Sequence, residues 1–148
     1  MRHAGPITAA LLCLFTTPAF ATGGFTCEVD DASLKFSAGG VFPGAAGPGF
    51  LNFGAKSTIR LPGVPEKFRK LDLSQNLIHS WIYTGDLRLR LKAENDEDDT
   101  FKSLDLVIQT TGEPDGGDWE GTYILDVFDS ANPGAPINAK GKATCSVE

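Results

Sequence analysis

Two stretches, Leu87-Arg88-Leu89-Arg90-Leu91 and Leu104-Asp105-Leu106-Val107-Ile108, decide the fold of this chain. In both of them every second residue is Leu or Ile. Successive side chains of a β-strand point to opposite faces, so each stretch predicts a strand with one buried face. The acidic run at 94–99 between them predicts the turn of a hairpin. The expected pairs are Leu91 with Leu104, Leu89 with Leu106, Leu87 with Ile108 and, on the outer face, Arg90 with Asp105.

Shorter runs of alternating residues predict further strands at 22–29, 33–37, 50–61, 119–128 and 137–147. Residues 39–49 are dense in Gly and Pro and are expected to form a loop, because Pro lacks a main-chain donor and Gly loses the most backbone entropy. Over residues 64–82 we expect a strand at 67–73, followed by a turn or one short helix. About eight short strands predict a single all-β domain at 22–148, either an antiparallel sandwich or a small barrel.

The first 21 residues have the features of a secretory signal peptide. Arg2 and His3 make a basic start, residues 7–15 form an apolar run, and Ala19 and Ala21 are the small residues that signal peptidase requires. The apolar run is shorter than the roughly 20 residues of a membrane-spanning helix. We therefore expect cleavage after Ala21, no membrane span, and a periplasmic or secreted protein.

The cysteines predict one disulfide bond. Cys13 would leave with the signal peptide, so that Cys27 and Cys145 remain near the two ends of the exported chain. In an oxidising compartment these two have a single internal pairing. Both lie on the apolar face of an expected strand, the first and the last. We therefore expect a buried disulfide between neighbouring first and last strands.

Composition disfavours several classes of function. The chain has 13 Lys and Arg against 19 Asp and Glu, a net charge of −6, whereas nucleic-acid binding needs clustered positive charge. We expect no nucleic-acid partner, and a basic protein or a small ligand suits the acidic chain better. One Met, two His and three Cys supply no recognisable ligand set for zinc, copper or haem. No cofactor is expected.

The densest group of polar and aromatic residues is Ile78-His79-Ser80-Trp81-Ile82-Tyr83. Alternation places His79, Trp81 and Tyr83 on one face, which would suit a surface that binds carbohydrate or peptide. The same side chains could instead be core or rim residues that carry a polar end. No catalytic residue is assigned, because the sequence has no Gly-x-Ser-x-Gly motif to place a nucleophile beside the His.

The acidic run contains the one candidate for a metal site, a calcium site at Asp96, Asp98 and Asp99. Asp96 and Asp98 have the alternate spacing of ligands in an EF-hand loop. Counted from Asp96, however, Phe101 stands where that loop has Gly, and Val107 stands where it has the bidentate Glu. A solvated hairpin tip therefore suits the run better than a calcium site.

Two resemblances bear on identity. The opening Phe25-Thr26-Cys27-Glu28 with the closing Cys145 resembles periplasmic lysozyme inhibitors of the membrane-bound C-type family. That likeness covers the two ends and implies a small antiparallel barrel with a terminal clasp. The Ser-Gly-rich loop that such inhibitors insert into lysozyme has no match in this sequence, so no residue is assigned to inhibition. The order of Trp81, the strand 87–91, Gly121-x-Tyr123 and the last Cys is similar to short exported proteins of unknown function from Gram-negative bacteria.

These observations predict an exported, non-catalytic binding protein. The alternative is a periplasmic inhibitor of a cell-wall hydrolase, which the first resemblance implies. A hydrolytic enzyme comes third, because one His remains in the exported chain and no motif supplies its nucleophile.

Overall fold

The computed structural model describes residues 23–42, 49–95 and 100–148; the expected signal peptide lies outside them. Along this part of the chain the elements are β1 (Gly23–Asp30), β2 (Leu34–Phe42), β3 (Leu51–Ile59), α1 (Glu66–Arg69), β4 (Lys70–Asp72), β5 (Leu77–Tyr83), β6 (Asp86–Asn95), β7 (Lys102–Thr111), β8 (Gly117–Asp129) and β9 (Ile137–Val147). The strands form one antiparallel sheet in the order β4-β3-β2-β1-β9-β8-β7-β6-β5.

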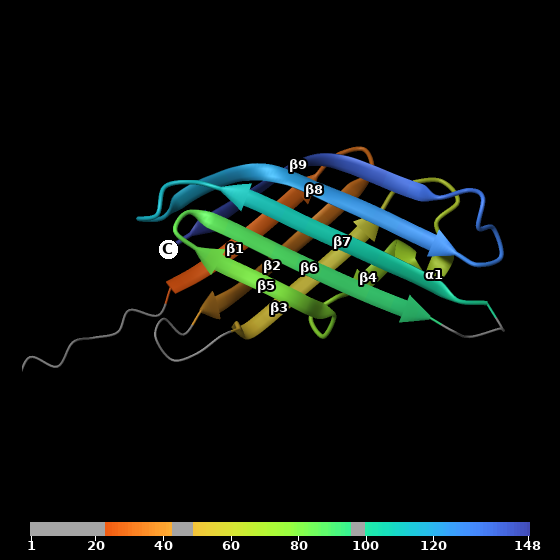
Figure 1. Ribbon diagram of the computed structural model, residues 1–148, viewed down its shortest axis with the longest axis horizontal. Coiled ribbons are helices and arrows are strands. Elements are labelled where there is room, and N and C mark those ends of the chain that lie inside the picture. The colour runs from red at the N-terminus through yellow and green to blue at the C-terminus, as the bar shows by residue number, and fades with distance from the viewer. Residues whose placement is uncertain (1–22, 43–48, 96–99) are drawn as a thin grey trace, which may run out of the picture.

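The sheet consists of two meanders that meet in its middle. Strands β1 to β4 follow one another on one side, β5 to β9 follow one another on the other, and the pairing of β1 with β9 joins them. The sheet curls into a half-barrel, in which β1–β3 lie behind β5–β8 and cross them at an angle (Figure 1). Apolar side chains from the inner faces of both meanders form the hydrophobic core. Its largest fully buried members include Trp119, Tyr123 and Phe36.

The all-β antiparallel fold is confirmed, but the expected closed sandwich or eight-strand barrel is wrong. The nine strands form one open sheet, and β4 and β5 stand at its two ends without pairing to each other over the described residues. Whether a sheet closes depends on the tilt and stagger of its strands. Neither property can be read from a count of strands.

The β6–β7 hairpin is confirmed, but its expected register is wrong by two residues. Leu91 pairs with Leu106 and Leu89 with Ile108, and Ala93 takes the place opposite Leu104. A shift of two residues leaves every side chain on the same face, so alternation cannot distinguish the two registers. The observed register extends the ladder to Asn95 and buries Ala93 at 6% exposure.

The disulfide is confirmed where β1 meets β9. Cys27 and Cys145 are paired residues in that ladder, their Cα atoms are 4.0 Å apart, and both side chains are buried. The bond joins residues 118 positions apart, the ends of the two meanders. The bond lowers the conformational entropy of the unfolded chain. For a loop of that length this stabilises the fold by at most about 4–5 kcal/mol.

Two expectations about local structure are corrected. The loop expected at 39–49 is strand as far as Phe42, because Gly39 and Gly40 pair with Thr26 and Phe25 of β1. Gly40 lies close to the ring of Phe25, since an added Cβ would be only 3.1 Å from it. The strand expected at 67–73 begins instead as the helix α1, and β4 then occupies Lys70–Asp72. Pro65 at the helix N-cap position starts that helical turn.

One buried polar contact ties the β1–β2 turn to β8. The Tyr123 hydroxyl donates to Asp31 at 2.7 Å, and the other carboxylate oxygen of Asp31 accepts the amides of Ser33 and Leu34. Burial and the carboxylate together raise the pKa of Tyr123 to about 12. Burial opposes ionisation of Asp31, but the bonds from Tyr123, Leu34 and Ser33 outweigh it and lower the Asp31 pKa.

Candidate functional site

The side chains of His79, Trp81 and Tyr83 lie on the outer face of β5, the strand at one end of the sheet. Trp81 is 49% exposed and Tyr83 is 70% exposed, and His79 is exposed beside them. The Trp81 and Tyr83 rings meet edge to face with centroids 6.2 Å apart. These three residues are called the β5 surface below. Alternation placed them together correctly, and whether they bind a ligand stays a prediction.

A two-residue turn fixes the position of β5 against β6. Thr84 and Gly85 both have positive φ, 47° and 79°, as a type I′ hairpin turn requires. A Cβ at Gly85 would lie 2.3 Å from the carbonyl oxygen of Gly112, so only glycine fits there. The turn pairs Tyr83 with Asp86 and Trp81 with Arg88.

In an antiparallel ladder alternate residues of a strand direct their main-chain N–H and C=O groups to opposite neighbours. Every second residue of β5 therefore points away from β6, to a side where no described strand lies. Gly112 donates to the carbonyl of Gly85, so the odd-numbered residues of β6 bond towards β7 and the even-numbered ones towards β5. Trp81 and Tyr83 therefore share main-chain bonds with β6. The N–H and C=O groups of Ser80 and Ile82 point to the open edge, where no described strand pairs with them.

A shallow depression of about 190 Å³ lies beside the β5 surface, lined by His79, Trp81, Asp86 and Arg88. Arg88 donates from Nε to Asp86 Oδ1 at 3.1 Å, and its Nη2 lies 2.8 Å from Oδ2. This fork-to-fork pair holds a planar polar group next to the Trp81 ring. The sequence pattern did not indicate Asp86 and Arg88 as neighbours of the aromatic cluster. The signal was present in Thr84-Gly85, a two-residue turn that folds β6 back along β5.

Arg90 and Lys92, the cationic residues that follow Arg88 on the outer face of β6, form ion pairs within the sheet. Arg90 binds Asp105 of β7 through Nε at 2.9 Å, and the hydrogen bond and charge of that carboxylate raise the Arg90 pKa. Lys92 Nζ lies 2.6 Å from Glu94. These pairs are exposed and add little stability. They reduce the net positive charge beside the β5 surface.

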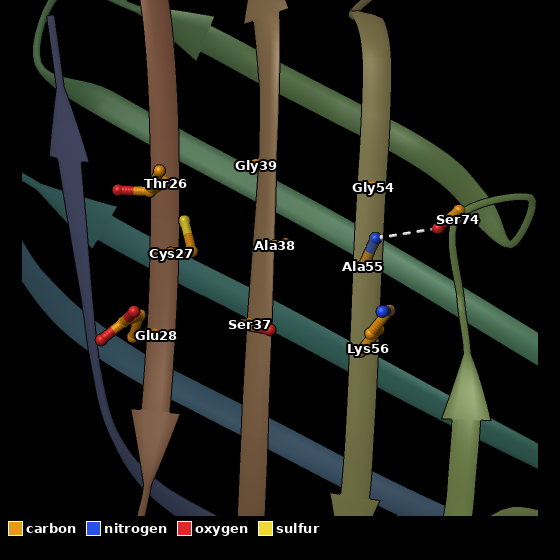
Figure 2. A pocket seen from close by; sticks show the side chains of 10 residues that line it. All are labelled: Thr26, Cys27, Glu28, Ser37, Ala38, Gly39, Gly54, Ala55, Lys56 and Ser74. Atoms are coloured by element: carbon orange, nitrogen blue, oxygen red, sulfur yellow. Dashed lines mark hydrogen bonds between the residues drawn. The ribbon is translucent and has the colours of Figure 1, made fainter.

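A second depression lies on the outer face of β1–β3, with a volume of about 380 Å³. Figure 2 shows the residues that line it: Thr26, Cys27 and Glu28 of β1, Ser37, Ala38 and Gly39 of β2, Gly54, Ala55 and Lys56 of β3, and Ser74. Small residues of adjacent strands make this hollow, since glycine leaves no side chain on the outer face. It has one carboxylate and one ammonium at its rim and no aromatic platform among the residues that line it. The β5 surface is therefore the better candidate site.

The opposite end of the sheet is capped. The hydroxyl of Ser74 accepts the amide of Ala55 at 3.1 Å, as Figure 2 shows. Leu73 donates to the Ala55 carbonyl at 2.8 Å, and Asp72 holds Ser74 by accepting its amide at 3.0 Å. The hydrogen bonds from the Ser74 side chain and amide lower the pKa of Asp72. Both edge groups of Ala55 thus have partners that β4, only three residues long, would not supply.

Two titratable side chains besides Arg88 line the depression beside the β5 surface, His79 and Asp86. The Asp86 carboxylate lines the depression together with His79, and both of its oxygens are bonded by Arg88. Among residues 23–42, 49–95 and 100–148, no three His, Cys, Asp or Glu side chains gather as a metal would require. The calcium candidates Asp96, Asp98 and Asp99 lie outside the described residues. No helix in the described part of the chain is long and apolar enough to cross a membrane.

Comparison with known proteins adds no relative: no family model, no curated protein and no solved structure matches this chain. The resemblances to lysozyme inhibitors and to exported Gram-negative proteins therefore stay hypotheses. The site has to be interpreted from its own geometry.

Proposed function

We propose that this protein is an exported, non-catalytic binding protein that holds a polypeptide at the β5 surface. The observation that carries the proposal is the coincidence of two features on one strand. β5 has main-chain donors and acceptors along its edge that no described strand pairs, and Trp81 and Tyr83 stand exposed on its face. Partners that add a strand to a sheet use both features, main-chain bonds for affinity and side-chain contacts for specificity.

The chemistry of the edge favours an extended peptide over a saccharide. Ser80 and Ile82 present N–H and C=O groups at the spacing of a β-ladder, which another extended main chain matches. A saccharide could stack on Trp81 and bond to the Asp86–Arg88 pair, but it would leave the main-chain row unmatched. The ring faces of Trp81 and Tyr83 suit the apolar side chains of an added strand.

Peptide binding is tested with the labelled protein on an array of synthetic heptapeptides. Trp81→Lys is compared with Ile124→Lys, which changes an exposed apolar residue of β8 at 40% exposure. We expect wild type and Ile124→Lys to bind the same peptides, and Trp81→Lys to lose at least tenfold in signal. Equal binding by all three proteins would overturn the proposal, and so would binding to a glycan array with none to peptides.

The hydrolase-inhibitor alternative has its own assay. An inhibitor that blocks the cleft of lysozyme stops muramidase activity in a one-to-one titration. We expect no inhibition at micromolar concentration. A stoichiometric block that Trp81→Lys leaves intact would show that the protein acts through a different surface.

A further inference from the structure

We infer that the polypeptide held at the β5 surface is β5 of a second copy of this chain, so that two sheets join edge to edge across a two-fold axis. This inference rests on the proposed function, because it uses the same strand, and it adds the identity of the partner. It starts from the way proteins protect the ends of their sheets. Natural edge strands are blunted with Lys, Pro or inward-pointing charge, or are covered.

Beyond a bulge at its start, which is itself a protective feature of natural edge strands, β5 lacks those protections. The strand Leu77-Ile78-His79-Ser80-Trp81-Ile82-Tyr83 contains no Lys, Arg, Asp, Glu or Pro. Its one irregularity is a bulge between Leu77 and His79, so the five residues 79–83 form a regular edge. The other end of the sheet is a three-residue strand with Lys70 and Asp72, and Ser74 caps the strand next to it. At that end the main-chain groups of Ala55 have partners beyond the short ladder with β4, whereas no described strand pairs with Ser80 and Ile82 of β5.

The residue order of β5 fits a copy of itself. Antiparallel self-pairing centred on Trp81 places Trp81 opposite Trp81 and His79 opposite Tyr83 of the second copy. Ser80 then lies opposite Ile82. Each ring on the outer face therefore meets a ring, and aromatic cross-strand pairs are among the stabilising ones. An uncharged strand also brings no like charges together when it pairs with itself, which a charged edge would do.

The directions of the main-chain N–H and C=O groups of β5 also fit a pairing centred on Trp81. Ser80 and Ile82 are the residues whose main-chain groups point to the open edge. With Trp81 at the centre, Ser80 of each copy exchanges two bonds with Ile82 of the other, which gives four main-chain bonds across the axis. Trp81 falls in the non-hydrogen-bonded position, where opposed side chains approach most closely. Main-chain and side-chain requirements thus select the same centre.

The exposed area sets the strength that we expect. An aromatic side chain can bury about 150–250 Å². The exposed half of Trp81 and the larger exposed part of Tyr83 then give roughly 500 Å² in two copies. Stable specific interfaces bury about 1,200 Å² or more. We therefore expect a weak dimer that forms and dissociates with protein concentration.

The test measures the mass of the oxidised protein by light scattering and sedimentation across a concentration series. We expect the wild-type mass to rise towards twice that of one chain, and Trp81→Lys and Trp81→Glu each to keep the mass of one chain. An equimolar mixture of the two variants should regain the doubled mass, because the register opposes Lys to Glu at position 81. Ile124→Lys is the control and should dimerise as wild type does.

A second pair of variants separates main chain from side chain. Ser80→Pro removes an edge donor that β6 does not use, whereas Ser80→Ala keeps it. We expect Ser80→Pro to halve the mass at high concentration and Ser80→Ala to leave it unchanged. Circular dichroism and the absence of free thiol confirm that each variant is folded and oxidised.

Three results would overturn the inference: a wild-type mass of one chain at every concentration, a doubled mass that Trp81→Lys and Ser80→Pro both leave intact, or variants that fail to associate when mixed. The proposed function would survive a monomeric wild type, provided that Trp81→Lys still abolishes peptide binding on the array. A dimer that binds no array peptide would sustain the inference and remove the wider peptide-binding role. The two proposals therefore fail separately.

Discussion

The two ends of this sheet differ in whether the main-chain groups at the edge have hydrogen-bond partners. At the β3–β4 end, the Ala55 amide and carbonyl are bonded by Ser74 and Leu73, and α1 packs close by. At the β5 end, the main-chain groups of Ser80 and Ile82 have no partner strand within the described residues, and Trp81 stands half exposed above them. At Ala55 a side-chain hydroxyl and the Leu73 amide take the place of a partner strand, whereas no described group does so at Ser80 and Ile82. We attribute the uncapped end to binding.

The junction between the meanders carries the largest effect on stability. Replacing Cys27 and Cys145 together by Ala should lower the free energy of unfolding by up to about 4 kcal/mol, since the unfolded chain regains the entropy of a very long loop. Urea unfolding of the oxidised wild type against the double variant measures this. If the two ends of the sheet act independently of the junction, the folded double variant still dimerises through β5. Loss of dimerisation in the folded variant would contradict the separation of roles.

Tyr123→Phe should cost less, about 2 kcal/mol, because it removes a buried hydroxyl that donates to the Asp31 carboxylate. The pH dependence identifies the contact. The Tyr123 pKa is raised to about 12 in the folded state, so stability falls as pH rises from 10 towards 12. The Asp31 pKa is lowered, so its contribution is lost as pH falls below 3.8.

In Tyr123→Phe the alkaline fall should disappear and the acid fall should shrink, because Asp31 keeps its two amide donors. Unfolding curves from pH 3 to pH 11 measure both slopes. An unchanged alkaline slope would show that Tyr123 is not its origin. Tyr123→Phe should leave dimerisation through β5 unchanged, because the Tyr123–Asp31 hydrogen bond stabilises the fold and takes no part in the dimer.

Ser74→Ala tests the closed end. It leaves the buried Ala55 amide without its acceptor, which should cost about 1–2 kcal/mol. It also uncovers one edge donor of β3, so we expect new, slow self-association that Trp81→Lys does not suppress. Ser74→Thr keeps the hydroxyl and serves as the control. A Ser74→Ala variant as stable and as soluble as wild type would mean that the cap is unimportant.

Tyr83→Lys, at the open end, should have the smallest effect on stability. Tyr83 is 70% exposed, so the free energy of unfolding should change by less than about 1 kcal/mol. Its dimer should dissociate at protein concentrations several-fold higher than those at which the wild-type dimer does, because Lys replaces the ring opposite His79. Thermal unfolding and light scattering separate the two effects. A large loss of stability would place Tyr83 in the fold rather than in the binding surface.

Alternation along the chain predicted which residues of β1, β6, β7, β8 and β9 face inward, including both cysteines, and it placed His79, Trp81 and Tyr83 on one face. The cysteine count, rather than alternation, predicted the disulfide. Alternation could not predict the β6–β7 register, because pairings that differ by two residues bury the same leucines. Gly39 and Gly40 were assigned to a loop from their intrinsic preference. In the fold both pair with β1, and Gly40 lies close to the Phe25 ring while Gly39 lies close to the Phe25 carbonyl oxygen.

The open end itself could not be predicted from sequence. Which strand stands last in a sheet depends on long-range pairing, here of β1 with β9 and of β3 with β4. The uncharged sequence of residues 77–83 indicates a strand suited to the interior of a sheet as much as one at its edge. Only the topology shows that no other strand of the described residues pairs with its outer main-chain groups.

Hydrogen exchange at the two ends tests the central claim most directly. The amides of Ser80 and Ile82 should exchange rapidly in dilute protein and become at least tenfold slower at concentrations where the mass has doubled. The Ala55 amide, bonded to Ser74, should exchange slowly at both concentrations. Exchange at Ser80 and Ile82 that does not depend on concentration, or that is as slow as at Ala55 in dilute protein, would contradict an open end used for binding.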